Sequence, residues 1–177
     1  DQHPPAMLYS FLIDAGAHYD GYIADITRTH AGEDSNEAFR HLLNDVRAIK
    51  LELISHCKAG VSYLDIHGLA LELIAEILIK HQFVINVDVQ TAISKGLVRI
   101  FFPHGIGHLL GLNTHDTPSI AKSLKETNET FKNLRLTQAL QNNMVLTIEP
   151  GIYFNNTVIS EASMDEDKGQ YLKIDLI

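Results

Sequence analysis

The sequence predicts an α+β protein in which strand-forming segments flank two amphipathic helices. Short apolar or β-branched runs typical of strands occupy residues 8–13, 22–29, 98–102 and 144–154. Two longer stretches, 35–60 and 62–81, space their apolar residues at helical intervals. No internal repeat or low-complexity segment divides the 177 residues, a length that suits one substantial core.

The first two predicted strands form a hairpin. Residues 8–13 are an apolar run, and residues 22–29 mix β-branched and aromatic side chains with polar ones. Gly16 and the Asp-Gly pair at 20–21 supply the turn, because these residues accept the backbone conformations that tight turns require.

The two helices carry start and stop signals. The first opens on the Ser-x-Glu pattern at Ser35 and ends before Gly60. The second begins at Ser62, followed three residues later by Asp65, which is the capping-box pattern with a shorter acid, and it ends near His81.

The second half of the chain is predicted to be strands joined by loops. Residues 98–102 read as a strand, and the polar, lysine-rich residues 117–134 read as a surface loop. Residues 144–154 read as a strong strand that Pro150 and Gly151 should interrupt or bulge.

Composition excludes several classes of function. The net charge of −8 comes from 14 basic and 22 acidic residues without a basic cluster, which argues against a nucleic-acid partner. No apolar run reaches the ~20 residues of a transmembrane helix, so we expect no membrane partner. The single cysteine, Cys57, excludes an intrachain disulfide framework and suits a reducing, cytoplasmic location. It lies in an apolar helical stretch and is interpreted as core packing.

The two ends of the sequence are not typical of the ends of a complete protein. The sequence begins at Asp1 without a methionine, and it stops within the apolar pattern of "YLKIDLI". We therefore expect residues 1–177 to be one incomplete domain of a longer protein.

Three carboxylates stand inside apolar strands. Asp14 ends "SFLID", Asp25 lies in "YIADIT", and Glu149 interrupts "VLTIEPG". Burying an ionised carboxylate costs several kcal/mol unless a cation or hydrogen bonds compensate it. Any one of them alone would be interpreted as a turn carboxylate bonded to backbone, but three together favour a shared metal site. Oxygen ligands with one imidazole suit Mn²⁺, Fe²⁺ or Co²⁺, with Zn²⁺ as a further candidate.

Three histidines cluster in "HGIGHLLGLNTHD", namely His104, His108 and His115. They could be metal ligands, the base of a nucleophile, or packed side chains, and this stretch alone leaves those alternatives open. Gly105 and Gly107 argue against a helix, and in an extended chain His104 and His108 would point the same way. The sequence contains no GxSxG, HExxH, GxxxxGK[ST] or CxxC motif.

Three segments, "DAGAHYDGYIADITRTH", "FFPHGIGHLLGLNTHD" and "LRLTQALQNNMVLTIEPGIYF", resemble the signature segments of the Xaa-Pro dipeptidases. These belong to the pita-bread metallopeptidases, together with the Xaa-Pro and methionine aminopeptidases. The resemblance implies a pita-bread fold, a pair of divalent metal ions (Mn²⁺ first), a dipeptide substrate with C-terminal proline, and a homodimer in the complete protein. The products would be a free amino acid and proline.

The resemblance also implies roles for individual residues. It makes Asp14, Asp25, His108 and Glu149 metal ligands. His115 matches a histidine that is not a ligand but contacts substrate and stabilises the transition state, and Glu149 would in addition transfer protons. His104, by the same comparison, is close to the ligands or structural.

Some features of the family fall outside this sequence. By the resemblance, the fifth ligand, a glutamate, would lie in a strand after Ile177. The acids of 160–169 are not expected to replace it, because that segment is polar and loop-like. A substrate-binding histidine and the N-terminal domain would precede Asp1. The alternatives kept open are an Xaa-Pro aminopeptidase, an inactive fragment, and a non-catalytic peptide-binding module of the same fold.

Overall fold

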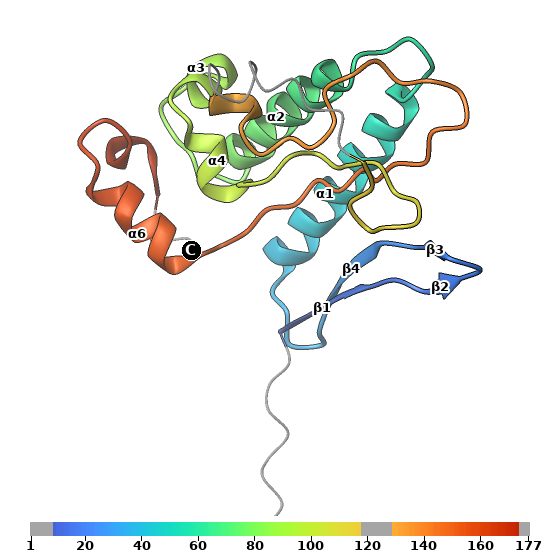
Figure 1. Ribbon diagram of the computed structural model, residues 1–177. Coiled ribbons are helices and arrows are strands. Elements are labelled where there is room, and N and C mark those ends of the chain that lie inside the picture. The colour runs from blue at the N-terminus through green and yellow to red at the C-terminus, as the bar shows by residue number, and fades with distance from the viewer. Residues whose placement is uncertain (1–8, 118–128, 174–177) are drawn as a thin grey trace, which may run out of the picture.

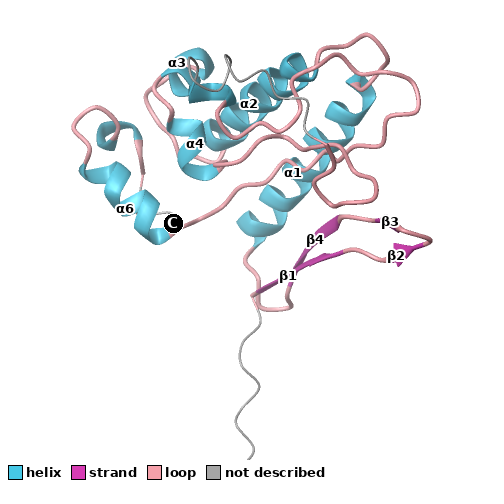
Figure 2. Cartoon of the chain, viewed as in Figure 1, coloured by secondary structure: helices cyan, strands magenta, loops and turns pink. Residues whose placement is uncertain are grey.

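The computed structural model describes residues 9–117 and 129–173, and it places a strand hairpin beside a body of helices (Figure 1). The strands are β1 (Ser10–Ala15), β2 (His18–Tyr19), β3 (Tyr22–Ile23) and β4 (Ile26–Ala31). The α-helices are α1 (Glu37–His56), α2 (Tyr63–Lys80), α3 (Val89–Ser94), α4 (Leu97–Phe101) and α6 (Asn156–Met164). Two 3₁₀ turns, η1 (Glu129–Phe131) and η2 (Gly169–Tyr171), complete the described elements. The mixed content agrees with the predicted α+β class (Figure 2).

The predicted hairpin is confirmed, with one difference in its second strand. β1 pairs antiparallel with β4, so that Asp14 lies opposite Thr27, and β2 pairs with β3. Asp20 and Gly21 form the turn at φ values of 49° and 88°, the left-handed pair that a two-residue hairpin turn needs. The predicted strand 22–29 is divided into β3 and β4, and Asp25 lies in the break between them.

Helix α1 forms where the sequence predicts it but begins one residue later. Its N-cap is Asn36, whose Oδ1 accepts a hydrogen bond from Phe39 N–H at 2.7 Å. Ser35, which the sequence favoured, donates its hydroxyl to the Tyr9 carbonyl instead. The side-chain amide of Asn36 therefore caps the helix, while Ser35 links the start of the helix to the hairpin.

Helix α2 is the centre of the core. It begins at the predicted cap, where Ser62 Oγ accepts from Leu64 N–H at 3.2 Å, and it is capped at its C-terminus by His81. Half of its residues are buried, as expected of a helix packed on several sides. They are Tyr63, Ile66, His67, Ala70, Leu71, Ile74, Ala75, Ile77 and Leu78. Helices α1, α3 and α4 all pack against it.

The strand predicted at 98–102 is wrong, because this segment forms helix α4. The side chains of Leu97, Val98, Ile100 and Phe101 are all buried. Four apolar residues around Arg99 are too few to show a clear periodicity, so the sequence fits a buried strand and a buried helix equally well. Contacts with α2 and α3 decide between them.

Residues 144–154 form no regular strand either. Only an isolated bridge joins Leu146 to Leu109, and Pro150 follows directly after the paired part, as expected of a residue that cannot donate to a ladder. The segment 160–169, predicted as a loop, contributes its first five residues to α6, whose N-cap Asn155 accepts from Thr157 and Val158. Of the predicted loop 117–134, residues 118–128 lie outside the described part of the chain.

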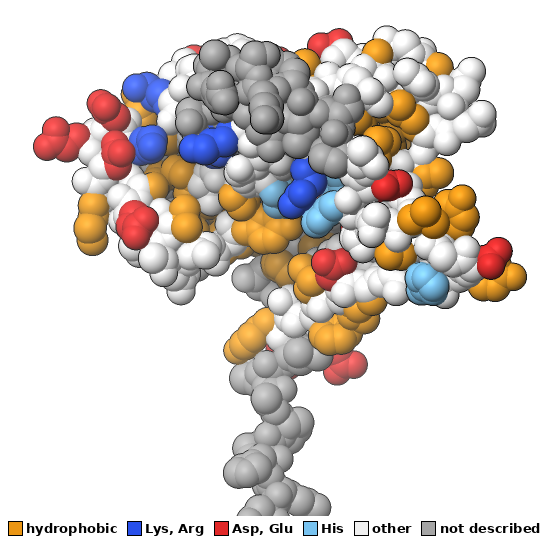
Figure 3. Space-filling view, in the orientation of Figure 1, with side chains coloured by type: hydrophobic (Ala, Val, Ile, Leu, Met, Phe, Trp, Pro, Cys, Tyr) orange, Lys and Arg blue, Asp and Glu red, His pale blue; other side chains and the backbone are white. Residues whose placement is uncertain are grey.

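The hairpin leaves much apolar surface uncovered. All six residues of β1 are exposed, and Phe11, Leu12 and Ile13 expose 50%, 54% and 43% of their surfaces. Figure 3 shows hydrophobic side chains gathered over this lower part of the molecule. Within residues 9–117 and 129–173, no helix is long and apolar enough to cross a membrane.

Candidate metal centre

Two extended segments carry the histidine and the glutamate of the candidate site. Their backbones run antiparallel, with Leu110 N–H donating to Val145 O at 3.0 Å and Thr147 N–H to His108 O at 2.9 Å. A third bond joins Glu149 N–H to Ile106 O at 2.9 Å. This pairing brings His108 and Glu149 together although 40 intervening residues separate them in the sequence.

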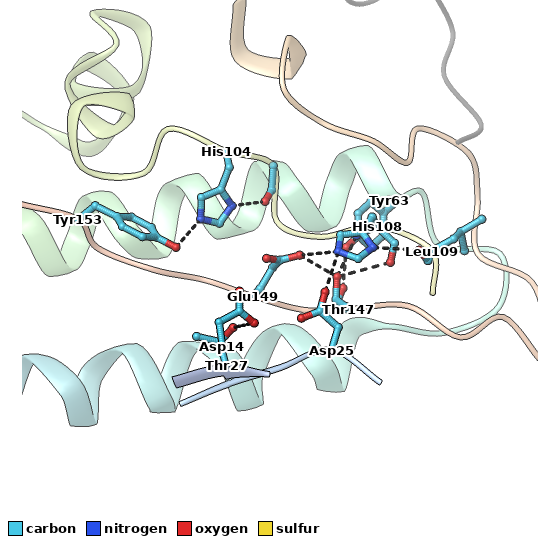
Figure 4. Close-up of polar contacts among 11 residues, drawn as sticks. Asp14, Asp25, Thr27, Tyr63, His104, His108, Leu109, Thr147, Glu149 and Tyr153 are labelled. Carbon is cyan, nitrogen blue, oxygen red and sulfur yellow. Dashed lines mark hydrogen bonds and ion pairs between the residues drawn. The ribbon is translucent and has the colours of Figure 1, made fainter. Parts of the chain in front are cut away.

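The ring of His108 is buried and its two nitrogens have different partners. Its exposed fraction is 4%. Nδ1 lies 2.9 Å from the Leu109 carbonyl oxygen, which can only accept, so Nδ1 carries the hydrogen. Nε2 then faces Asp25 Oδ2 and Glu149 Oε1, each at 3.3 Å (Figure 4). A neutral His108 would thus present a lone pair to two carboxylates.

This donor set has the chemistry of a divalent-metal site. Two carboxylates and an imidazole lone pair repel one another unless a cation, either a proton or a metal ion, lies among them. Ligand atoms that share an ion at about 2.0–2.2 Å lie roughly 3–3.5 Å from one another, and the 3.3 Å separations match that spacing. Among the described residues, however, no group of three or more His, Cys, Asp or Glu side chains is arranged to hold a metal ion. The chemistry of these three side chains nevertheless fits a divalent ion.

Asp14 lies next to this cluster, with a partner of its own. Its Oδ1 accepts a hydrogen bond from Thr27 Oγ1 at 2.9 Å, across the β1–β4 pair. Figure 4 shows it below Glu149, on the hairpin side of the site. Burial first, and then the Glu149 and Asp14 carboxylates, raise the pKa of Tyr153, so both acids act on the same phenol.

His115 lies beside the cluster. Its ring packs edge-on against that of His108, with centroids 4.4 Å apart and planes at 78°. Burial lowers the pKa of His115, and the electrostatic effects of Arg135 and His108 add to this, whereas the Glu149 and Asp25 carboxylates oppose it. Its position agrees with the role that the resemblance implied, and the role itself stays a prediction.

His104 faces a different partner from His108. Its Nδ1 lies 2.8 Å from the Gly105 carbonyl and therefore carries the hydrogen, so Nε2 accepts from the Tyr153 hydroxyl at 2.9 Å. Sequence reasoning missed Tyr153, Thr147 and Tyr63. Thr147 could have been found, because residues two apart in an extended chain face the same side as Glu149. No sequence signal pointed to Tyr63.

An open cavity connects the cluster with the hairpin and α1. It measures about 360 Å³, and its lining includes two acids, Asp25 and Glu149, and three basic residues, Arg28, Arg47 and Lys50. Burial, followed by the charges of Arg28 and Arg47, lowers the pKa of Lys50. The carboxylates of the site thus open onto space large enough for a small peptide.

Comparison with known proteins shows the family. The sequence profile of metallopeptidase family M24 matches residues 8–171. The chain therefore belongs to metallopeptidase family M24, and the predicted pita-bread class is confirmed.

The similar proteins include individual Xaa-Pro dipeptidases. The chain is 40% identical to the Xaa-Pro dipeptidase of Serratia proteamaculans and 43% identical to that of Klebsiella pneumoniae, in each case over 164 residues and 90% of this chain. It spans 37% of the length of each of these relatives.

Solved structures of an aminopeptidase are also similar to this chain. Aminopeptidase P of Escherichia coli in complex with the inhibitor Pro-Leu matches with a TM-score of 0.69 and 31% identity, over 82% of this chain and 30% of that one. A zinc-substituted form of the same enzyme in complex with product matches equally well.

Proposed function

We propose that the complete protein is a metal-dependent peptidase that hydrolyses Xaa-Pro dipeptides to a free amino acid and proline. The similarity to Xaa-Pro dipeptidases supports this substrate class. The observation that carries the proposal is the buried His108 ring, which is fixed by the Leu109 carbonyl and faces two carboxylates at 3.3 Å.

Asp14, Asp25, His108 and Glu149 would hold two divalent ions. Mn²⁺ is the first choice for these ligands, followed by Co²⁺, Fe²⁺ and Zn²⁺, and a zinc-substituted aminopeptidase P exists among the similar structures. When bound, such ions supply Lewis acidity, which polarises the carbonyl before proline and makes water more acidic.

Glu149 would transfer protons during hydrolysis, and His115 would stabilise negative charge. Glu149 Oε1 accepts from Thr147 Oγ1 at 2.8 Å, so Oε2 remains to accept a proton from the attacking water and deliver it to the proline nitrogen. That nitrogen carries no hydrogen in the substrate bond and therefore needs the proton in order to leave. His115, packed against His108, would stabilise negative charge that develops on the carbonyl oxygen.

The same resemblance supports proposals for the domain, the oligomeric state and the cellular location. We propose that residues 1–177 form part of the catalytic domain, that the complete protein is a homodimer, and that it acts in the cytoplasm. The single cysteine supports a reducing compartment. Size-exclusion chromatography with light scattering of the full-length protein tests the dimer.

The decisive experiment removes and restores metal. Full-length protein should lose hydrolysis of an Xaa-Pro dipeptide after chelation and regain it with Mn²⁺, with two ions bound per chain. Asp25→Asn and His108→Ala should abolish both binding and turnover. Full activity in metal-free protein would overturn the proposal.

An Xaa-Pro aminopeptidase is the second candidate, because aminopeptidase P of Escherichia coli is among the structural neighbours. The two activities differ in whether residues may follow proline. Comparing an Xaa-Pro dipeptide with an Xaa-Pro-Yaa tripeptide separates them: a dipeptidase cleaves only the first, whereas efficient cleavage of the tripeptide identifies an aminopeptidase.

A further inference from the structure

Thr147 contacts two of the proposed ligands through one hydroxyl. The backbone N–H of His108 donates to Thr147 Oγ1 at 3.0 Å, and the same oxygen donates to Glu149 Oε1 at 2.8 Å. Because the hydroxyl accepts from a backbone group held in the antiparallel pairing, its single hydrogen is free to point at the carboxylate. Thr147 therefore couples the position of one ligand's backbone to the orientation of the other ligand's side chain.

Tyr63 holds Thr147 from the side of the core. It is the first residue of α2, its side chain is fully buried at 0% exposure, and its hydroxyl donates to the Thr147 carbonyl at 2.9 Å (Figure 4). Burial raises the pKa of Tyr63, so the phenol keeps its hydrogen and remains a donor. A residue 84 positions earlier in the chain thus fixes the backbone between His108 and Glu149.

Gly107 shows how tightly this contact is packed. A Cβ placed there would lie 2.5 Å from the Tyr63 hydroxyl oxygen, and 2.2 Å and 2.7 Å from the carbonyl and hydroxyl oxygens of Thr147. All three atoms are held by hydrogen bonds and cannot withdraw without breaking them. The absence of a side chain at 107 lets Tyr63 and Thr147 meet behind the site.

We propose that Tyr63 is a positioning residue which, acting through Thr147, holds Glu149 Oε1 and the His108 backbone in the geometry that binds metal. Tyr63 itself touches neither substrate nor ligand side chain. The inference rests on the proposed function for the metal centre, and it extends that centre to the first turn of α2.

The test uses the full-length protein and compares four variants. Tyr63→Phe removes the phenol oxygen, Thr147→Val removes the hydroxyl at constant shape, and Thr147→Ser keeps it. Tyr171→Phe is the matched control, a half-buried tyrosine whose ring faces Lys95 away from the site. Mn²⁺ affinity is measured by calorimetry, and kcat and KM are measured with an Xaa-Pro dipeptide.

Tyr63→Phe and Thr147→Val should weaken Mn²⁺ binding by ~10–100-fold and lower kcat, while KM stays within about twofold. Thr147→Ser should restore Mn²⁺ affinity and kcat relative to Thr147→Val, and Tyr171→Phe should bind and turn over like the parent. Parental Mn²⁺ affinity and kcat in both Tyr63→Phe and Thr147→Val would overturn the inference. If Tyr63→Phe does not fold, the contrast between Thr147→Val and Thr147→Ser decides.

Amide hydrogen exchange at His108 in metal-free protein gives a readout independent of metal and activity. Tyr63→Phe should speed this exchange, because the Thr147 oxygen that accepts the amide loses its support, whereas Tyr171→Phe should not. If the parent binds no metal and cleaves nothing, the proposed function fails. Unchanged exchange at His108 in Tyr63→Phe would by itself overturn the positioning role.

Discussion

Single side chains at the site are oriented by backbone carbonyls. Leu109 O holds the hydrogen of His108 on Nδ1, and Gly105 O does the same for His104. Both rings therefore present Nε2 as an acceptor, one to carboxylates and the other to a phenol. Within the described residues His115 makes no such carbonyl contact, and its ring packs edge-on against that of His108.

Replacing His115 by alanine in the full-length protein should leave metal content unchanged and reduce kcat by ~10²–10⁴-fold, because a donor to the developing oxyanion is lost. Metal analysis together with steady-state kinetics checks this. Stoichiometric loss of metal would instead make His115 a ligand.

His67 gives a prediction for pH-dependent stability. It is 2% exposed, its Nε2 donates to the Thr130 carbonyl, and its Nδ1 has no partner within the described residues. Burial lowers its pKa from 6.5 to about 4. Below pH 6.5 the unfolded chain binds a proton that the folded chain refuses, so stability is fully present above pH 6.5 and falls as the pH drops towards 4, by at most roughly 3 kcal/mol.

In His67→Gln, which keeps a donor but does not titrate, this component should vanish. Urea unfolding of parent and variant at pH 7 and pH 4.5 measures it. The idea fails if both proteins lose the same free energy of unfolding between these pH values.

At the scale of elements, α1 and α2 are joined by apolar packing and by one charged cluster. Asp45 on α1 accepts from Lys80 at 2.8 and 2.9 Å and lies 2.7 Å from His81 Nε2, at the end of α2. These partners, the Lys80 hydrogen bond first, hold the pKa of Asp45 below its usual 3.8 although burial opposes them. The cluster therefore stabilises the fold above the unfolded-state pKa and loses its effect as the pH falls below it.

Asp45→Asn should lower the free energy of unfolding at pH 7 by about 1–2 kcal/mol, because two charge-assisted bonds are weakened. Asp34→Asn, an exposed acid in the loop before α1, is the matched control and should change stability by under ~0.5 kcal/mol. Chemical unfolding should show a larger difference at pH 7 than at pH 3, because Asp45 is increasingly protonated as the pH falls. Equal effects of the two substitutions would contradict the role of the cluster.

At the scale of the whole molecule, the helical body is packed and the hairpin is not. Helices α1 to α4 share one core, whereas β1, within the described residues, pairs only with β4 and exposes apolar side chains. A two-stranded hairpin with an open apolar face is marginal by itself and favours association with other chains. Asp14 lies on β1 and Asp25 between β3 and β4, so the geometry of the site depends on what supports these strands.

Residues 1–177 expressed alone should therefore associate and should hydrolyse Xaa-Pro dipeptides at least ~100-fold more slowly than the full-length protein. Light scattering and a dipeptidase assay with added Mn²⁺ check both parts. A monomer with two bound ions and parental turnover would refute this expectation.

Features that depend on residues close together in the chain could be predicted from the sequence. The Asp20-Gly21 turn, the Ser62 cap and the extents of α1 and α2 follow from backbone preferences and helical periodicity, which act over a few positions. The approach of His108 to Asp25 and Glu149 agrees with the expectation drawn from three carboxylates placed in apolar segments.

Other features depend on contacts between residues far apart in the chain and could be seen only in the tertiary structure. The run 97–101 became a helix whose four apolar side chains are buried by α2 and α3, and 144–154 remained irregular, with an isolated bridge at Leu146. Tyr63 reaches Thr147 across 84 positions, and no local pattern encodes such a contact. Local preferences amount to fractions of a kcal/mol per residue, whereas burial of a large apolar side chain contributes about 1.5–3 kcal/mol, so packing overrides preference wherever the two conflict.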